Sequence, residues 1–363
     1  MSLSPSLIEC LNRARADLRM GVPVVLTGEG TAALVIAAEA LTADRLARLR
    51  ALGGQPVLAI TAHRAGTLKA RAYDGDIARV MVPADATGHW IRDVADPAND
   101  LSSPLKGPLM TARGGSAALH RAAVRLVKSA QLLPAALLLD IADGPALAAS
   151  DNLTCIDIDA AGPELFRASP LHPIVSARLP MTASEAGRVH IFRPEDGNAE
   201  HYAIEIGKPR RDAPVLARLH SACFTGDVLG SLKCDCGPQL GAALARMGAE
   251  GSGVLLYLNQ EGRGIGLANK MRAYSLQDQG FDTVEANHRL GFEDDERDFR
   301  IGAGILRRMG FSAARLLTNN PAKVRMLTEN GVDVVERVPL KVGETTENAA
   351  YLATKAAKSG HLL

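Results

Sequence analysis

The 363-residue sequence has few aromatic residues, almost no net charge and no long hydrophobic run. Aromatic side chains make up 4% of the chain, which argues against stacking platforms for single-stranded nucleic acid. With 41 basic and 40 acidic residues there is no global positive field to hold a polyanion, so phosphate recognition must be local. No apolar run reaches the roughly 18 residues that a transmembrane helix needs. We therefore expect neither a nucleic acid nor a membrane as a partner.

The sequence also lacks a secretory signal and has few cysteines. Residues Met1 to Leu11 show no basic region followed by an apolar core and a small-residue cleavage site, so we expect a cytoplasmic location. There are five cysteines, an odd number, and three of them fall within fourteen residues. In a reducing compartment this clustering favours a metal site over a disulfide framework.

The length and the residue patterns predict two domains. Apolar residues make up 47% and charged residues 22% of the chain, as in ordinary globular proteins. At roughly 100–200 residues per domain, the length favours two. Helical and strand patterns alternate, which predicts a mixed α+β or α/β fold in which each domain is a mixed sheet with packed helices. The proline-punctuated stretch from Ala168 to Glu185 is interpreted as the linker, with domains at 1–170 and 176–363.

Hydrophobic periodicity predicts the main secondary-structure elements. In the first half, helices are expected at 6–20, 31–52 and 117–131, and strands at 23–26, 55–61 and 134–141. In the second half, strands are expected at 215–220, 254–258 and 314–318, and helices at 239–247, 267–279, 299–309 and from Pro321 onward.

The cysteine cluster is the clearest chemical signal. Cys223, Cys234 and Cys236 have the spacing C-x10-C-x-C. Three thiolates leave a fourth zinc position for water, which is the catalytic pattern, whereas four closed ligands are the structural one. His220 is close in sequence and could close the site. Buried apolar cysteines are the remaining alternative, because unpaired cysteines are common in protein cores.

Two loops have the features of phosphate-binding elements. The segment Gln260–Gly266 follows a strand and opens a helix, and its glycines allow close approach of a ligand to the backbone. Its pattern is G-x-G-x-G, so a dinucleotide-binding fold is not indicated and a plain turn is the alternative. In the second loop Asn320 suits a helix N-cap and Pro321 the first helical position. Lys323 then lies in the first turn, either beside a bound anion or simply solvated.

These segments together resemble GTP cyclohydrolase II, the family that commits GTP to riboflavin biosynthesis. The resemblance covers roughly Ala177 to Val342. The matching stretches, in order, are RLHSACFTGD, SLKCDCGPQL, QEGRGIGLANKMRAYSLQDQG, DTVEANHRLGF, DERDF and LLTNNPAKV.

The resemblance implies a zinc-dependent reaction. The three cysteines would hold a catalytic zinc that polarises water for attack on C8 of guanine. Formate and pyrophosphate would leave, and the product would be 2,5-diamino-6-ribosylamino-4(3H)-pyrimidinone 5′-phosphate. Asp295 would be the general base. Arg297 would act on the α-phosphorus, either as a nucleophile or by stabilising charge. Tyr274 matches the tyrosine of the ring-opening members.

The resemblance also implies a nucleotide site, Mg²⁺ with the triphosphate, and a homodimer. Mg²⁺ suits this role because it is a hard cation that bridges phosphate oxygens. The implied nucleotide contacts are Arg218, Leu219, His220, Ser221, Ala222, Gln239, Glu261, Gly262, Arg263, Thr283, Thr318 and Lys323.

Two departures from the family pattern keep other functions open. The family usually has an acidic residue where this chain has Ala222, and an arginine where it has Asn259. One alternative is therefore a paralogue that acts on another purine nucleotide. A second is a nucleotide-binding regulator with a structural zinc.

The N-terminal half is similar to 3,4-dihydroxy-2-butanone 4-phosphate synthase, to which this enzyme is often fused. The similarity lies in MGVPVVLTGEG, IAAEALT and AAVRLVKSAQLLPAALLLDI. The synthase needs an acidic cluster for Mg²⁺, where this chain offers Glu29, and a Gly-His-Thr-Glu block, where it reads Ala118-Leu119-His120-Arg121. We interpret Glu29 and His120 as surface or packing residues and expect an inactive domain with a folding, dimerisation or regulatory role.

Overall fold

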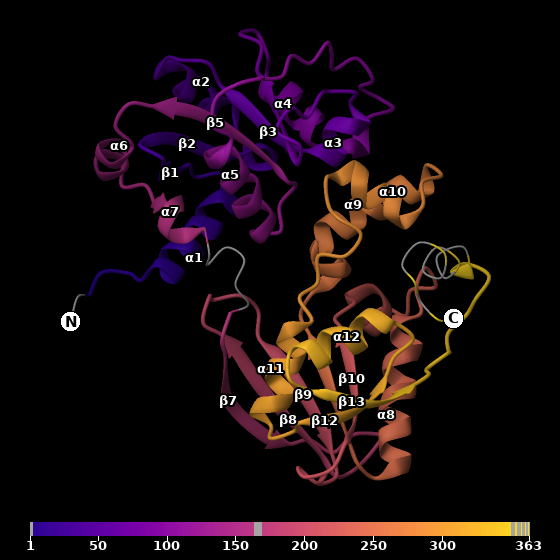
Figure 1. Cartoon of the computed structure of the whole chain (residues 1–363). Helices are drawn as coiled ribbons and strands as arrows, with labels where there is room; N and C mark the ends of the chain where they lie inside the picture. The colour runs from indigo at the N-terminus through magenta and orange to yellow at the C-terminus, as the bar shows by residue number, and fades with distance from the viewer. Residues whose placement is uncertain are drawn as a thin grey trace. The chain divides into compact units, whose positions relative to one another are not determined.

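The chain folds into two compact units that do not divide the sequence at a single point. The computed structural model describes residues 3–162 and 169–349, together with residues 353, 357, 360 and 362. Unit 1 contains Met1–Arg167 and Ala268–Asp294, and unit 2 contains Ala168–Leu267 and Asp295–Leu363. Figure 1 shows the orange helices α9 and α10 beside the purple elements of unit 1. The predicted domains at 1–170 and 176–363 place these helices in the second domain and remain a prediction.

Unit 1 is built on a six-stranded mixed sheet with the order β4-β3-β5-β2-β1-β6. All neighbouring strands are antiparallel except β1 and β6, which are parallel. The strands are β1 Val24–Gly28, β2 Thr31–Ala37, β3 Val57–Thr61, β4 Ile77–Met81, β5 Ala135–Ile141 and β6 Cys155–Asp157.

The helices of unit 1 pack on this sheet and on one another. Helices α1 and α5 share a buried cluster with β1, β2, β3 and β5. Helix α10 packs on α3, where the rings of His63 and His288 stack with their centroids 4.0 Å apart. The helices are α1 Leu7–Arg19, α2 Ala43–Ala51, α3 Ala62–Thr67, α4 Gly88–Ala95, α5 Ala118–Ser129, α6 Gly144–Asp151, α7 Ile158–Ala161, α9 Leu267–Asp278 and α10 Thr283–Leu290, with 3₁₀ turns at Ala38–Ala40 and Pro97–Asn99.

The prediction of a helix over 31–52 is wrong for its first part. Residues Thr31–Ala37 form strand β2, and the helix in this region, α2, begins only at Ala43. Every residue of β2 after Thr31 is buried. A strand that is buried on both faces is an unbroken apolar run, which hydrophobic periodicity cannot separate from a buried helix.

Unit 2 is built on a seven-stranded mixed sheet with the order β13-β12-β10-β11-β9-β8-β7. Strands β13, β12, β10 and β11 run parallel, and the remaining pairs are antiparallel. The two-domain, mixed-sheet architecture predicted from sequence is thus confirmed. The strands are β7 Leu171–Arg178, β8 Gly187–Pro194, β9 His201–Ile206, β10 Val215–Ser221, β11 Gly253–Leu258, β12 Ala313–Leu317 and β13 Asp333–Val338.

Helices cover both faces of this sheet, and the central strands are therefore apolar on both sides. Helix α8 (Cys236–Glu250) packs on one face with Leu216 and Leu255, while α11 (Arg300–Arg308) and α12 (Pro321–Glu329) pack on the other with Leu219 and Leu256. Parallel strands that are covered on both faces read as continuous hydrophobic runs. This explains why β11 was predicted from sequence, and the apolar residues that flank Arg218 in β10 and Arg315 in β12 gave a weaker form of the same pattern.

The stretch interpreted as a linker contains a strand of the sheet. Residues Leu171–Arg178 form β7, the edge strand of unit 2, and Ala168 lies outside the described residues. Pro173 sits where the register between β7 and β8 shifts. A proline lacks the N–H that an inner strand must donate, so it is tolerated at an edge or a bulge. Pro173 is therefore a feature of an edge strand and not of a linker.

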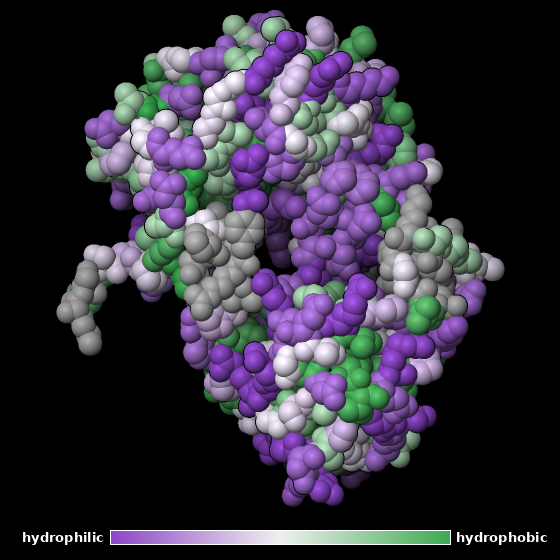
Figure 2. Space-filling model, in the orientation of Figure 1, coloured by the Kyte–Doolittle hydropathy of each residue, from purple (hydrophilic) through white to green (hydrophobic). Residues whose placement is uncertain are grey.

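The visible surface is largely hydrophilic, with apolar residues gathered in small groups, as Figure 2 shows. Among the residues that the structure describes, no helix is both long and apolar enough to cross a membrane.

Candidate active site

The candidate site in unit 2 lies where its parallel strands end. Strands β10, β11 and β12 are parallel neighbours, so their carboxyl ends meet at one edge of the sheet. The predicted site segments follow directly: Cys223 comes after β10, the loop Gln260–Gly266 after β11, and Thr318 after β12. In open α/β sheets this edge is where ligands bind.

The three cysteines come together as the spacing predicts. Their sulfur atoms all lie within 4.8 Å of one another, and the Sγ atoms of Cys223 and Cys234 are 3.7 Å apart. Tetrahedral zinc with Zn–S bonds of about 2.3 Å requires sulfur atoms about 3.8 Å apart. Gly226 lies against the cluster, where a Cβ atom would be 2.8 Å from the Sγ of Cys234. The cysteines therefore form a possible metal site, and the absence of a side chain at Gly226 leaves room for it.

The electrostatics of the three sulfurs also favour a cation. Hydrogen bonding to Cys223 raises the pKa of the Cys234 and Cys236 thiols, and burial raises both further. Thiolates this close together repel one another. The positive charge of a bound cation offsets this repulsion, and the thiols lose their protons when they bind the metal. The donor set and its spacing are compatible with zinc.

His220 is not a fourth member of this group. Among the described residues, the three cysteines are the set that could hold a metal ion. The Nε2 atom of His220 lies 3.0 Å from a carboxylate oxygen of Asp227. Burial lowers the pKa of His220. Among the described residues, His220 therefore does not add a fourth ligand to the three sulfurs.

Asp227 is a site residue that the sequence reasoning missed. Its carboxylate accepts hydrogen bonds from the backbone N–H of Cys223 at 3.0 Å and from the hydroxyl of Tyr257 at 2.9 Å, and it also contacts His220. It therefore fixes the backbone of the first cysteine. The available signal was its position at the end of the matching stretch RLHSACFTGD.

The glycine-rich loop after β11 has a backbone shape that requires its glycines. Gly262, Arg263 and Gly264 have φ angles of 62°, 61° and 95°. A Cβ atom at Gly264 would lie 2.8 Å from the backbone of Glu296, so the loop packs tightly on that segment. The backbone N–H of Glu296 donates to the carbonyl of Arg263 at 3.0 Å. The loop is therefore not a plain turn, because it holds the acidic segment in place.

Glu261 joins this loop to the cysteine loop. Its carboxylate accepts hydrogen bonds from the N–H of Phe224 at 2.5 Å and from the N–H of Gly262 at 2.8 Å. Phe224 follows the first cysteine directly. Glu261 therefore links the loop after β10 to the loop after β11 through hydrogen bonds.

Asp295 and Arg297 form a bidentate pair beside the end of β10. The guanidinium donates to the Asp295 carboxylate at 2.7 and 2.5 Å, and its Nη1 lies 3.3 Å from the Oγ of Ser221. Burial raises the pKa of Asp295, but the hydrogen bonds and charge of Arg297 outweigh it, so the pKa lies below its ordinary value. Asp295 belongs to the acidic run at 293–298, and Arg297 keeps its carboxylate ionised at the site.

Arg218 and Gln239 form a buried pair beneath the site. Arg218 donates to the carbonyl of Leu317 at 3.1 Å and to the Oε1 of Gln239, while Gln239 donates to Asp235. Burial lowers the pKa of Arg218 to about 10. Within the described part of the chain, its Nε has no hydrogen-bond partner. An unsatisfied buried guanidinium N–H is a strong attractor for an anionic or carbonyl oxygen.

Lys323 is not a solvated surface lysine. It is 8% exposed, its Nζ donates to the carbonyl of Leu219 at 2.8 Å, and it lies 5.1 Å from the ring centroid of Phe299. Thr318 is also buried and accepts from the N–H of Asn320 at 3.0 Å. A buried cation at the sheet edge is consistent with a role in holding an anion.

Comparisons with known proteins decide the family. Residues 172–339 match the family model of GTP cyclohydrolase II. A GTP cyclohydrolase-2 from Azospirillum brasilense is 42% identical over 369 residues, covering 100% of this chain and 96% of its own length. The chain belongs to the GTP cyclohydrolase II family. It is therefore an enzyme, a hydrolase, as the sequence analysis expected.

Further relatives cover parts of the chain. A GTP cyclohydrolase-2 from Escherichia fergusonii is 62% identical over 193 residues, covering 53% of this chain and 97% of that protein. Among solved structures, a two-domain 3,4-dihydroxy-2-butanone 4-phosphate synthase from A. baumannii is 18% identical, with a TM-score of 0.34, covering 92% of this chain and 99% of that one. At this TM-score the overlay does not bear on the fold or chemistry of unit 1.

Two residues expected from the GTP cyclohydrolase II resemblance lie in unit 1. Tyr274 is on α9, with the Nζ of Lys270 5.7 Å from its ring centroid, and Thr283 begins α10 and accepts from Gln277 at 3.1 Å. The other predicted site residues belong to unit 2. The roles of Tyr274 and Thr283 therefore remain predictions.

The two departures from the family pattern have defined local surroundings. Asn259 donates from its side chain to the carbonyl of Glu200, and its N–H donates to the ring of His201 at 3.0 Å. The N–H of Ala222 donates to the carbonyl of Leu258 at 2.7 Å, which continues the pairing of β10 and β11. Asn259 is thus committed to the neighbouring strand β9.

Unit 1 contains a cavity of about 820 Å³ whose lining includes Arg79, His120 and Asp140. Arg79 is engaged by Asp74 at 2.8 Å and by loop carbonyls. His120 is 8% exposed, and burial followed by the charge of Arg79 lowers its pKa to about 4. Glu29 is exposed and accepts from the hydroxyl of Ser116 at 2.6 Å.

Proposed function

We propose that this chain hydrolyses GTP to 2,5-diamino-6-ribosylamino-4(3H)-pyrimidinone 5′-phosphate, formate and pyrophosphate, the first step of riboflavin biosynthesis. The observation that carries the proposal is the convergence of the three-cysteine group and the Asp295–Arg297 pair on the loops of one sheet edge. Family membership supports the same reaction.

Cys223, Cys234 and Cys236 would hold one zinc ion per chain, which when bound supplies Lewis acidity toward water and the guanine ring. The surrounding residues maintain the geometry of the ligands. Asp227 holds the backbone of Cys223 through its N–H, and the N–H of Gly226 donates to the Sγ of Cys223 at 3.3 Å.

Asp295 would act as the general base. Its carboxylate is ionised, 32% exposed, and able to accept a proton at an oxygen atom. We assign Arg297 to charge stabilisation at the α-phosphate, because a guanidinium stays protonated and is a poor nucleophile. Its two-pronged N–H pattern, which here holds Asp295, is also the pattern that matches phosphate oxygens.

The nucleotide would bind along the same edge. Lys323 and Arg218 supply positive charge, and Mg²⁺ would accompany the triphosphate as a hard cation on phosphate oxygens. Contacts with the nucleotide are proposed at Leu219, Ser221, Gln239, Glu261, Gly262, Arg263 and Thr318, all in unit 2. Tyr274 and Thr283, which lie in unit 1, remain predictions from the family resemblance.

The test is to incubate the zinc-replete full chain with GTP and Mg²⁺ under anaerobic conditions and to follow formate and pyrophosphate together. Equal amounts of both products are expected. Pyrophosphate without formate would mean that the phosphate chemistry occurs without the ring opening. Neither product, with GTP shown to bind, would refute the proposal and favour a nucleotide-binding regulator.

A paralogue that acts on another purine nucleotide is the second candidate, and Asn259 and Ala222 are the observations that favour it. An arginine at 259 would add a cation at the sheet edge, whereas Asn259 is bonded to Glu200 and His201. A panel of purine nucleoside triphosphates, compared by kcat/KM, separates the two. A preference for a nucleotide other than GTP would support the paralogue.

We propose further that unit 1 is not a synthase. In its cavity Arg79 is committed to Asp74, and the lowered pKa of His120 leaves that ring neutral near pH 7. Neither group is therefore a free charge for a sugar phosphate. Conversion of ribulose 5-phosphate to the butanone phosphate by the purified chain would overturn this proposal.

A homodimer is the expected assembly, and one surface feature supports it. Phe224, Val228, Leu229 and Leu232, which follow Cys223, are 46%, 68%, 64% and 57% exposed. Large apolar side chains grouped on a surface commonly mark a protein interface. Light scattering of the wild type and of Val228→Glu/Leu229→Glu tests this, with dissociation to monomer expected in the variant.

A further inference from the structure

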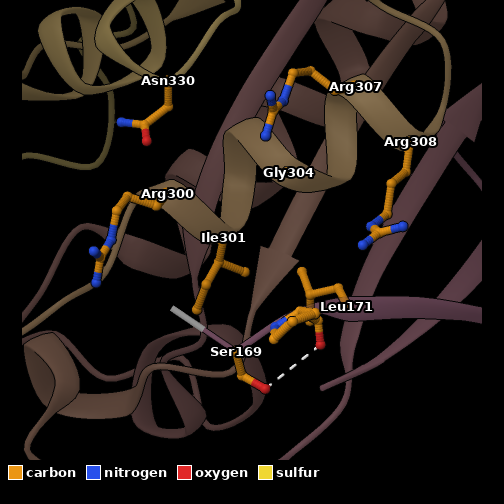
Figure 3. A pocket seen from close by; sticks show the side chains of 9 residues that line it. Ser169, Leu171, Arg300, Ile301, Gly304, Arg307, Arg308 and Asn330 are labelled. Atoms are coloured by element: carbon orange, nitrogen blue, oxygen red, sulfur yellow. Dashed lines mark hydrogen bonds between the residues drawn. The ribbon is translucent and has the colours of Figure 1, made fainter. Parts of the chain in front are cut away.

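A hollow lined by three arginines lies on the outer side of α11 in unit 2. Its volume is about 400 Å³, and it is bounded by α11, by Ser169 to Leu171 at the start of β7, and by Asn330 after α12. Figure 3 shows Arg300, Arg307 and Arg308 around it, with Gly304 on the helix between them. No acidic residue is among the described residues that line it.

The sequence of α11 creates this hollow. The helix buries Gly302, Ala303, Ile305 and Leu306, and therefore turns positions 300, 304, 307 and 308 outward. Position 304, at the centre of this outer stripe, is a glycine. A Cβ atom there would meet nothing within 4 Å, so the space above the helix is open because no side chain fills it.

The charges of the hollow are only partly balanced. Arg300 is paired with Asp298 through two hydrogen bonds of 2.8 Å. Arg307 and Arg308 form no ion pair with any residue that the structure describes. Arg307 and Arg308 line the same hollow, and like charges that share one space repel one another. A multivalent anion in the hollow would remove this repulsion.

We propose that this hollow binds a polyphosphate anion, at a site separate from the sheet edge that carries the cysteines. Arginine forks match pairs of phosphate oxygens, so two or three guanidinium groups favour a di- or triphosphate over a monovalent ion. Inorganic pyrophosphate and the triphosphate tail of a nucleotide share this chemistry. Binding here does not require that the chain hydrolyse GTP.

The experiment is calorimetric titration of the zinc-replete full chain with inorganic pyrophosphate alone. In the wild type we expect a binding event that Gly304→Glu and Arg307→Gln/Arg308→Gln weaken by about tenfold or more, because the first places a carboxylate in the hollow and the second removes two guanidinium groups. Gly304→Ala and Arg325→Gln are matched controls, because the first leaves the hollow open and the second removes an exposed arginine outside it.

Each outcome bears on the proposal. Loss of one binding event in the two hollow variants alone, with the melting temperature unchanged, would support it. Identical titrations in all variants, or equal weakening in Arg325→Gln, would overturn it. Repeating the titration with inorganic triphosphate and with a non-hydrolysable GTP analogue distinguishes the two sources of the ligand. GTP turnover, measured in parallel, reports separately on the proposed function.

Discussion

The two units have similar architecture but gather their charged groups differently. Both are mixed sheets with packed helices. In the cavity of unit 1, Arg79 is paired with Asp74 and His120 is neutral near pH 7, while Asp140 and three further aspartates also line it. In unit 2, charged groups from distant parts of the sequence meet where three parallel strands end. The comparison shows that strand direction, more than the presence of a cavity, determines where reactive groups can gather.

The sharpest test of this contrast is to compare cysteines between the units. In Cys234→Ser we expect the zinc content to fall from about one per chain toward zero, and formate release to fall at least about a hundredfold. Cys155→Ser, in unit 1, should change neither quantity. Metal analysis and formate assay check both variants, and equal losses would contradict the assignment of the metal site to unit 2.

The next largest effect on turnover is expected when a carboxylate of unit 2, Asp295, is compared with one of unit 1, Asp140. Asp295→Asn should lower kcat about 10²–10⁴-fold, the usual contribution of a general base, while zinc content stays the same. Asp140→Asn, at the unit 1 cavity, should leave turnover unchanged.

The same pair predicts a pH effect. Arg297 lowers the pKa of Asp295, so the base stays ionised as the pH falls. In Arg297→Gln the pKa of Asp295 rises, and the acid limb of the kcat profile should move to higher pH. An unmoved limb would show that another group controls it.

Asp227 should have an intermediate effect. Asp227→Asn removes a charge that holds Cys223 and contacts His220, so zinc affinity should fall about 10–100-fold. Stability should fall by about 1–3 kcal/mol, because the amide keeps only one acceptor oxygen for the buried donors that the carboxylate serves with two. A chelator competition and a denaturant titration measure these, and Asp212→Asn, an exposed aspartate of unit 2, is the control.

The smallest effect should come from His120 in unit 1. Its folded-state pKa of about 4 lies below the ordinary 6.5, so the unfolded state takes up a proton first as the pH falls. The wild type should therefore lose stability between pH 6.5 and about 4. His120→Leu should flatten this loss without changing GTP turnover. Thermal unfolding across the pH range checks it.

Much of unit 2 could be predicted from local sequence, and the reasons are physical. Strand β11 is buried on both faces and is an unbroken apolar run, and β10 and β12 are mostly buried runs interrupted by Arg218, His220 and Arg315. The cysteine cluster followed from spacing alone. Strand β7, by contrast, is almost entirely exposed and contains Pro173, so it carried neither the apolar run nor the alternation of a strand.

Other features depend on tertiary packing and left no local signal. Nothing in the pattern of α9 and α10 indicates that they pack with unit 1, because that choice depends on contacts such as the His63–His288 stack. The burial of Lys323 depends on Leu219, about a hundred residues earlier. Asp227 is one aspartate among many in the sequence and gains meaning only from its three partners.

The division of unit 1 into two chain segments has a consequence for how the protein is made. Synthesis begins at the N-terminus, and domains generally fold as they emerge from the ribosome. Unit 1 includes Ala268–Asp294, so it cannot be complete until most strands of unit 2 have already been synthesised. During translation, unit 1 therefore cannot finish folding until Ala268–Asp294 has been synthesised. A stop in translation anywhere between residues 168 and 267 would leave both units incomplete.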